Sequence, residues 1–196
     1  MTEVRTVAVI GAGTMGRGIA HAAALGGYRT ILEDLFPKSL RQAETELRAN
    51  LDQAVKLGKV DAADADAAFS RLEYAGSVDE AAREADLVIE AVPDEMESKL
   101  EIFTMLDKFC RPATILASNT SKLSVSEIAS VTYRARKCVG MRFLNPVHQM
   151  KRLEIVRALE TDDDTLAAVV EVGKRMGKEV VVIKEKSPAS SPAFPA

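Results

Sequence analysis

Apolar runs alternate with charged helical segments along most of the chain. Continuous apolar runs predict strands buried on both faces, first at residues 7–10 and later in the segments ADLVIEAVP and ATILAS. Segments with acids in the first turn and bases in the last predict helices, most clearly TDDDTLAAVVEVGKRMG. Three more strands are expected in KCVGMRFLNP, RLEIVRALE and KEVVVIKE. This alternation predicts an α/β domain with a doubly wound, mostly parallel sheet.

Two stretches depart from the alternation. Residues 39–72 have a charged helical pattern interrupted near Gly58, which predicts an inserted hairpin of two helices, longer than a crossover between strands requires. The pattern fits both a solvated, salt-bridged pair and a pair that contacts a ligand. Residues 187–196 contain three prolines and three serines among small residues, and they predict a disordered tail after a domain at 1–186.

Composition and charge restrict the possible partners. The 196 residues predict one domain, and the net charge of −3 gives no electrostatic reason to bind nucleic acid or an anionic membrane. Cys110 and Cys138 lack metal-ligand spacing, so we expect reduced thiols and no metal site. The sequence has no signal-peptide pattern and no apolar run near the roughly 20 residues of a membrane span. We therefore expect a soluble cytoplasmic protein.

The turn after the first strand carries a phosphate-binding pattern. Gly11, Gly13 and Gly16 form the motif G-x-G-x-x-G, and Thr14 and Met15 lie between its last two glycines. Its first glycine permits the tight turn, its second lets backbone approach a pyrophosphate, and its third allows the helix to pack closely on the strand. Amides at the start of the helix favour the negative phosphates. The motif predicts a dinucleotide site on a Rossmann-type sheet.

An acid at the end of the second strand defines the dinucleotide further. Asp34 follows Gly13 by 21 residues, where a carboxylate binds ribose hydroxyls and repels a 2′-phosphate. The site is therefore predicted to prefer NAD to NADP. We expect strand alternation to point the neighbouring Glu33 the other way. Asn119, Thr120 and Ser121 follow another strand, where they fit either the ligand crevice or a plain turn.

Four segments resemble a known family. VIGAGTMGRGIA, DLVIEAVP, TILASNTSKLSVSEIA and GMRFLNPVHQMKRLEIVRALET match, in order, signatures of the 3-hydroxyacyl-CoA dehydrogenase family, which includes bacterial 3-hydroxybutyryl-CoA dehydrogenases. The resemblance covers residues 4 to about 188. It implies an NAD-binding Rossmann domain, a following all-helical domain that makes a dimer, and hydride transfer between NAD and the 3-hydroxyl carbon of an acyl-CoA. It also implies that the helical hairpin helps to hold CoA.

The resemblance also implies roles for single residues. Asp34 would bind the adenosine ribose, and the nicotinamide end would be lined by Glu90, Lys99 and Asn119. The residues that match the family's catalytic and neighbouring positions are Ser121 for the substrate oxygen, Glu154 for the glutamate that orients a histidine, and Asn145 for the asparagine of the H-F-F-N-P motif. Asp94 stands where the family often has glutamate.

The catalytic histidine of the family falls on Arg142. Arginine has only hydrogen-bond donors and stays protonated, so it cannot accept the proton of an alcohol. His148 would substitute only if its loop folded back, and His21 is expected to be a packing or surface residue. We expect an impaired dehydrogenase. Two alternatives are a non-catalytic dinucleotide-binding protein and a dehydrogenase or reductase of another acyl or hydroxy acid, with Arg142 gripping a carboxylate.

The end of the sequence is a second departure. After VVVIKEKSP the family continues with a Gly-Phe-Val stretch and the helical domain, whereas here ASSPAFPA follows. We therefore expect the dimerisation domain to be absent, either through a one-nucleotide deletion or through a cut at a domain boundary. Apolar surface left uncovered by that domain predicts self-association.

Overall fold

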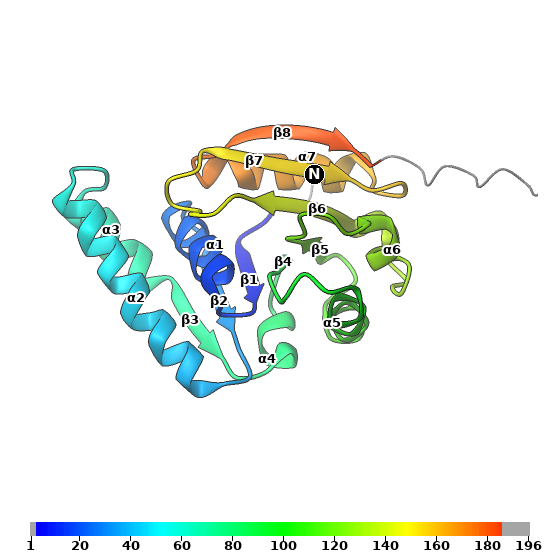
Figure 1. Ribbon diagram of the computed structural model, residues 1–196, viewed down its shortest axis with the longest axis horizontal. Coiled ribbons are helices and arrows are strands. Elements are labelled where there is room, and N and C mark those ends of the chain that lie inside the picture. The colour runs from blue at the N-terminus through cyan, green and yellow to red at the C-terminus, as the bar shows by residue number, and fades with distance from the viewer. Residues whose placement is uncertain (1–2, 186–196) are drawn as a thin grey trace, which may run out of the picture.

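The apolar runs form one eight-stranded sheet in the computed structural model, which describes residues 3–185 (Figure 1). The strands lie in the order β3-β2-β1-β4-β5-β6-β7-β8. Their bounds are β1 (Thr6–Ile10), β2 (Arg29–Glu33), β3 (Leu72–Ala75), β4 (Leu87–Glu90), β5 (Ile115–Ser118), β6 (Cys138–Phe143), β7 (Arg152–Arg157) and β8 (Glu179–Lys184). All neighbours pair in parallel except β6 and β7, which are antiparallel. The expected doubly wound, mostly parallel sheet is confirmed.

Helices cover both faces of this sheet (Figure 1). They are α1 (Thr14–Leu25), α2 (Pro37–Lys56), α3 (Ala62–Ser70), α4 (Val78–Ala82), α5 (Met96–Phe109), α6 (Val125–Ala129), the 3-10 helix η1 (Ala135–Lys137) and α7 (Asp163–Arg175). Alternate residues of β1 belong to two different cores: Val7 and Val9 pack with α1 and α7, while Ala8 and Ile10 pack with α4, α5 and α6. A strand between two cores needs apolar residues at every position, which explains the continuous apolar runs.

The inserted hairpin consists of α2 and α3, and the chain turns between them near Gly58, which has a φ of +67°. Arg48 of α2 pairs with Asp52 on its own helix and with Asp66 of α3, at N–O distances of 3.1 and 2.9 Å. These exposed pairs match a salt-bridged hairpin. The two helices together run from Pro37 to Ser70, two residues earlier at each end than the expected range of about 39–72, and Leu72 already begins β3.

Two short elements and the direction of one strand were not expected from the sequence. β3 and α4 are only four and five residues long, too short to show a clear period. β7 runs antiparallel to its neighbour β6, so residues 144–151 form the loop that joins the two strands. Within residues 3–185 no helix is both long and apolar enough to cross a membrane. The tail expected at 187–196 lies outside the described residues.

Candidate active site

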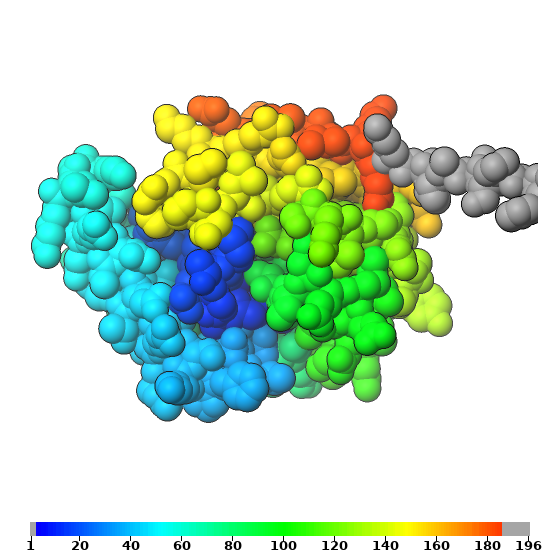
Figure 2. Space-filling view, viewed as in Figure 1, coloured from blue at the N-terminus to red at the C-terminus, as the bar shows by residue number. Residues whose placement is uncertain are grey.

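A cavity of about 860 Å³ opens at the carboxyl ends of the strands, within the size range of small-molecule sites. Its walls come from the ends of β1, β2, β4, β5 and β6 and from α1, α4 and α5. Figure 2 shows the glycine-rich segment, in blue, between the residues after β2, the α5 region and the β6–β7 loop. This is the crevice where a doubly wound sheet binds ligands.

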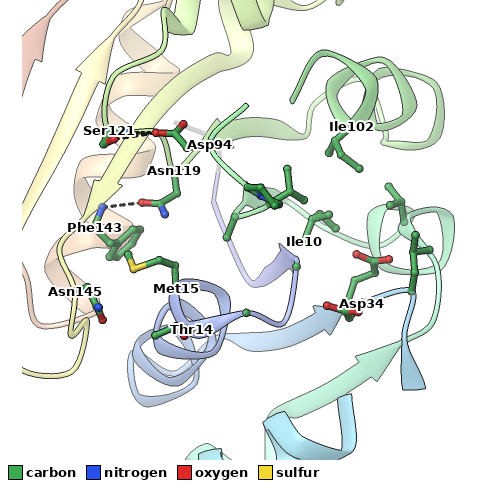
Figure 3. Close-up of a pocket in the computed structure, with 18 of the residues that line it drawn as sticks. Ile10, Thr14, Met15, Asp34, Asp94, Ile102, Asn119, Ser121, Phe143 and Asn145 are labelled. Carbon is green, nitrogen blue, oxygen red and sulfur yellow. Dashed lines mark hydrogen bonds between the residues drawn. The ribbon is translucent and has the colours of Figure 1, made fainter. Parts of the chain in front are cut away.

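The glycine-rich turn leaves room for a phosphate. A Cβ on Gly16 would lie 1.7 Å from the carbonyl oxygen of Gly11, so α1 approaches the turn as closely as glycine allows. A Cβ on Gly13 would meet no atom within 4 Å, and Gly13 lines the cavity next to the first turn of α1. Thr14 and Met15 line it as well (Figure 3). Because the open space lies at the start of a helix, the turn fits a pyrophosphate.

Asp34 lines the same cavity just after β2. Its Oδ2 accepts a hydrogen bond from the amide of Ala12 at 3.0 Å, and its Oδ1 accepts one from the amide of Phe36 at 2.9 Å. These bonds fix the carboxylate beside the glycine turn. Each oxygen keeps a second lone pair for a hydroxyl donor, so the geometry suits a ribose.

Glu33 also lines the cavity, although strand alternation was expected to direct its side chain away from the site of Asp34. Its side chain is 2% exposed, and Oε1 has no hydrogen-bond partner among the described residues. Burial, and then the neighbouring Asp34, raise the pKa of Glu33 to about 7, against the opposing effect of the Gly11 amide. Glu33 and Asp34 therefore both line the cavity, which the alternation of side chains along a strand did not predict.

Glu90 and Lys99 form a buried ion pair that the cavity does not reach. Lys99 Nζ lies 2.7 Å from Glu90 Oε1, and both side chains are fully buried. Glu90 also accepts hydrogen bonds from Ser118 Oγ at 2.7 Å and from the amide of Val92 at 2.8 Å. Burial raises the pKa of Glu90, and Lys99 opposes that rise. The pair joins α5 to the end of β4. Neither residue lines the cavity.

The loop after β5 brings Asn119 and Ser121 to the cavity, with the buried Thr120 between them. Ser121 Oγ donates to Asp94 Oδ2 at 2.8 Å (Figure 3). Thr120 Oγ1 donates to Asp94 Oδ1 at 2.6 Å. Burial disfavours the charged form of Asp94, but these hydrogen bonds outweigh it and lower its pKa. Asn119 Oδ1 accepts from the amide of Phe143 at 3.0 Å, which ties the loop to β6 (Figure 3).

Arg142 faces the same end of the cavity from β6. It lies opposite Glu154 in the β6–β7 ladder, with Nη1 3.1 Å from Glu154 Oε2, and its Nε donates to the carbonyl oxygen of Thr120 at 3.0 Å. Arg152 holds the other oxygen of Glu154 at 2.7 Å. Asn145 lines the cavity, whereas Glu154 meets it only through Arg142.

The two histidines of the chain lie together and away from the cavity lining. Their ring centroids are 6.4 Å apart, in an edge-to-face arrangement. His21 is buried on α1, and burial, followed by His148, lowers its pKa to about 4. His148 lies beside His21 of α1 and does not line the cavity as Ser121 and Arg142 do, so it is not placed to replace a base at position 142.

Comparison with known proteins identifies the family. Residues 6–186 match the family described as "3-hydroxyacyl-CoA dehydrogenase, NAD binding domain". A probable 3-hydroxybutyryl-CoA dehydrogenase of Bacillus subtilis (strain 168) is 38% identical over 183 residues, which are 93% of this chain and 63% of that protein. A 3-hydroxybutyryl-CoA dehydrogenase of Bradyrhizobium diazoefficiens is 37% identical over 93% of this chain and 62% of its own length. The chain thus spans less than two thirds of either relative.

Solved structures agree with this assignment. The crystal structure of (S)-3-hydroxybutyryl-CoA dehydrogenase from Ralstonia eutropha superposes with a TM-score of 0.90 at 36% identity, over 94% of this chain and 65% of that one. A diketoreductase superposes with a TM-score of 0.88 at 30% identity, over 95% and 66%. The glycine turn, Asp34 and the strand-end cavity lie within the matched range. The chain belongs to the 3-hydroxyacyl-CoA dehydrogenase family and carries its NAD-binding domain.

Proposed function

We propose that the chain binds NAD across the strand-end cavity and turns over 3-hydroxyacyl-CoA only weakly, because Arg142 stands where the reaction needs a proton acceptor. The pyrophosphate would lie on the glycine turn at Gly13, and the adenosine ribose on Asp34. The nicotinamide would lie at the other end, near Asn119 and Ser121. Bound there, NAD supplies the hydride acceptor for oxidation of an alcohol.

The observation that carries this proposal is the pairing of Arg142. Removing a hydride from a secondary alcohol requires that the hydroxyl proton leave, and a positioned base contributes about 10²–10⁴-fold to such steps. Arg142 offers only donors, and two of its nitrogens already bond Glu154 and the Thr120 carbonyl. Ser121 is hydrogen-bonded to Asp94 and is not in contact with a histidine in the described chain. Among the described residues the site therefore keeps groups that bind a substrate oxygen but has no histidine beside it, and the Asp94 carboxylate that contacts Ser121 is a weak proton acceptor because its hydrogen bonds lower its pKa.

A second candidate is a reductase of another acyl or hydroxy acid, with Arg142 binding a substrate carboxylate. Arg142 lines the cavity and its side chain is 30% exposed, so a ligand can reach it. The similarity to a diketoreductase favours considering dicarbonyl substrates. Arginine binds carboxylates strongly because its planar donors match their two oxygens. A third, non-catalytic role in dinucleotide binding is distinguished from both by the absence of turnover with any substrate.

Dinucleotide binding is tested by fluorescence titration with NADH and NADPH. Wild type is expected to bind NADH more tightly than NADPH, because Asp34 repels a 2′-phosphate. Gly13→Ala is expected to weaken NADH binding by roughly tenfold or more. The added methyl group would occupy space proposed for the pyrophosphate and so prevent its charge-assisted hydrogen bonds with the backbone amides. Its thermal midpoint should equal that of wild type, because the added Cβ meets no protein atom within 4 Å.

Gly16→Ala is the matched control for this test. The same methyl group at Gly16 collides with the Gly11 carbonyl, so this variant is expected to lose stability as well as affinity. A wild type that binds neither dinucleotide, or a Gly13→Ala variant that binds NADH as wild type does, contradicts the proposed placement.

A further inference from the structure

Glu33 is a buried acid with an unmet hydrogen-bonding need on the wall of the cavity. It ends β2, is 2% exposed, and has no partner for Oε1 within the described chain. Buried polar atoms are nearly always paired, so each exception calls for an explanation. Asp34 is bound to two backbone amides through both of its oxygens, whereas the Glu33 carboxyl interacts with the Gly11 amide alone and its Oε1 has no partner in the described chain. This difference indicates that the partner of Glu33 is a ligand.

Glu33 lies at the end of the cavity that is lined mainly by apolar side chains. Ile10, Val78, Ile102 and Met105 line the region around Glu33 with apolar surface. Figure 3 shows Asp34 and Ile102 at one end of the cavity, and Asn119, Ser121 and Asn145 at the other, with the glycine turn between them. A flat, largely apolar group with polar edges fits the Glu33 end. With phosphates at the turn and a ribose at Asp34, that group is the adenine base.

We propose that Glu33 is a recognition residue for adenine and enters the complex as a neutral carboxylic acid. The proposal rests on the dinucleotide site proposed above. A protonated carboxyl has one O–H donor and an acceptor oxygen on the same group. An adenine edge presents a ring-nitrogen acceptor beside an amino donor, so the two groups can form a pair of hydrogen bonds. An ionised carboxylate offers acceptors only and would oppose the ring nitrogen.

The surroundings of Glu33 favour its neutral form. Asp34 on its own strand is a negative neighbour, and the charged residue that α5 presents to the cavity is Glu101. β1, β3 and α4 contribute the apolar Ile10, Ala75 and Val78 to this side of the sheet. No cation among the described residues lines this end of the cavity.

The direction of the pH effect follows from the raised pKa of Glu33, about 7. Below that value the carboxyl is already neutral and binding needs no proton. Above it, the ionised acid must take up a proton before it can pair with adenine, so affinity falls as pH rises. Adenine bound next to Glu33 also excludes water from its carboxyl group, and this favours the neutral form of Glu33 further.

The experiment is calorimetric titration of the full chain with ADP-ribose, which carries the adenosine half without nicotinamide. With a pKa of about 7 and binding of the neutral acid only, the wild-type Kd is expected to rise about 25-fold between pH 6.5 and 8.5. At pH 8, two buffers with different ionisation enthalpies should give different binding enthalpies, because a proton is taken up. This second readout requires no mutation. Glu33→Gln keeps a donor and an acceptor but cannot ionise, so its Kd should be nearly independent of pH.

Glu33→Met and Glu101→Gln are the controls. The first removes both hydrogen bonds at similar volume, and it should bind more weakly than Glu33→Gln at pH 6.5. The second makes the same acid-to-amide change at an exposed position on the cavity wall and should keep the wild-type pH slope. A flat wild-type profile, or a Glu33→Gln profile as steep as that of wild type, overturns the proposal. Absence of ADP-ribose binding at every pH overturns the dinucleotide site itself and this inference with it.

Discussion

Replacing Arg142 with histidine is expected to raise kcat/KM for the reduction of acetoacetyl-CoA by NADH at least about 10²-fold, the lower end of what a positioned acid or base contributes. Position 142 faces the cavity from β6 and lies opposite Glu154 in the β6–β7 ladder. A histidine there can exchange a proton near neutral pH, and Glu154 can orient its ring and stabilise its charged form. Arginine does neither, because it has no lone pair to accept the proton.

The control for this prediction is Arg142→Gln. It removes the cation and its bonds to Glu154 and Thr120, as the histidine variant does, but provides no group that titrates near neutrality. NADH affinity and thermal midpoints of both variants show whether the site is intact. A glutamine variant as fast as the histidine variant would mean that relief from the cation, not a new acid, increased the rate. Wild-type turnover equal to that of Arg142→His would contradict the account of the missing base.

Replacing Lys99 with methionine is expected to lower the free energy of unfolding by about 3–5 kcal/mol, the usual cost of breaking a buried ion pair by removing one partner. Lys99 and Glu90 are both fully buried at 2.7 Å. Without Lys99, the carboxylate of Glu90 retains only Ser118 Oγ and the Val92 amide as donors. It must then be charged in an apolar interior or take up a proton. Urea denaturation followed by circular dichroism measures the change.

Two further variants separate pairing from loss of volume. Lys99→Met combined with Glu90→Leu replaces the whole pair by apolar side chains and should recover much of the lost stability, because no isolated charge remains. Arg48→Met breaks the exposed salt bridges between α2 and α3 and should cost far less, since solvent screens such pairs. If the double variant is no more stable than Lys99→Met, the interpretation as an unpaired buried charge is wrong.

Most strands and helices could be predicted from the sequence because the local spacing of apolar residues reflects which positions are buried. Strands between two cores are apolar at every position, and α7 has acids in its first turn and bases in its last. The short elements β3 and α4 were not predicted, because four or five residues are too few to show a hydrophobic period. The antiparallel direction of β7 was not predicted for another reason. Strand direction depends on which partner a segment meets, and a single strand looks the same in either orientation.

By itself, the sequence determined the order of the longer strands and helices, the glycine-rich turn with the acid at Asp34 after the next strand, and the presence of Arg142 at the position where the family resemblance implies a catalytic histidine. These are local patterns or single chemical identities. Only the tertiary structure decided that Arg142 pairs with Glu154, that Glu90 and Lys99 are sealed beneath the cavity, and that Glu33 lines its wall. Such contacts depend on sheet register and helix packing between segments distant in sequence, and burial then decides which charges are paired and which carboxyls stay neutral.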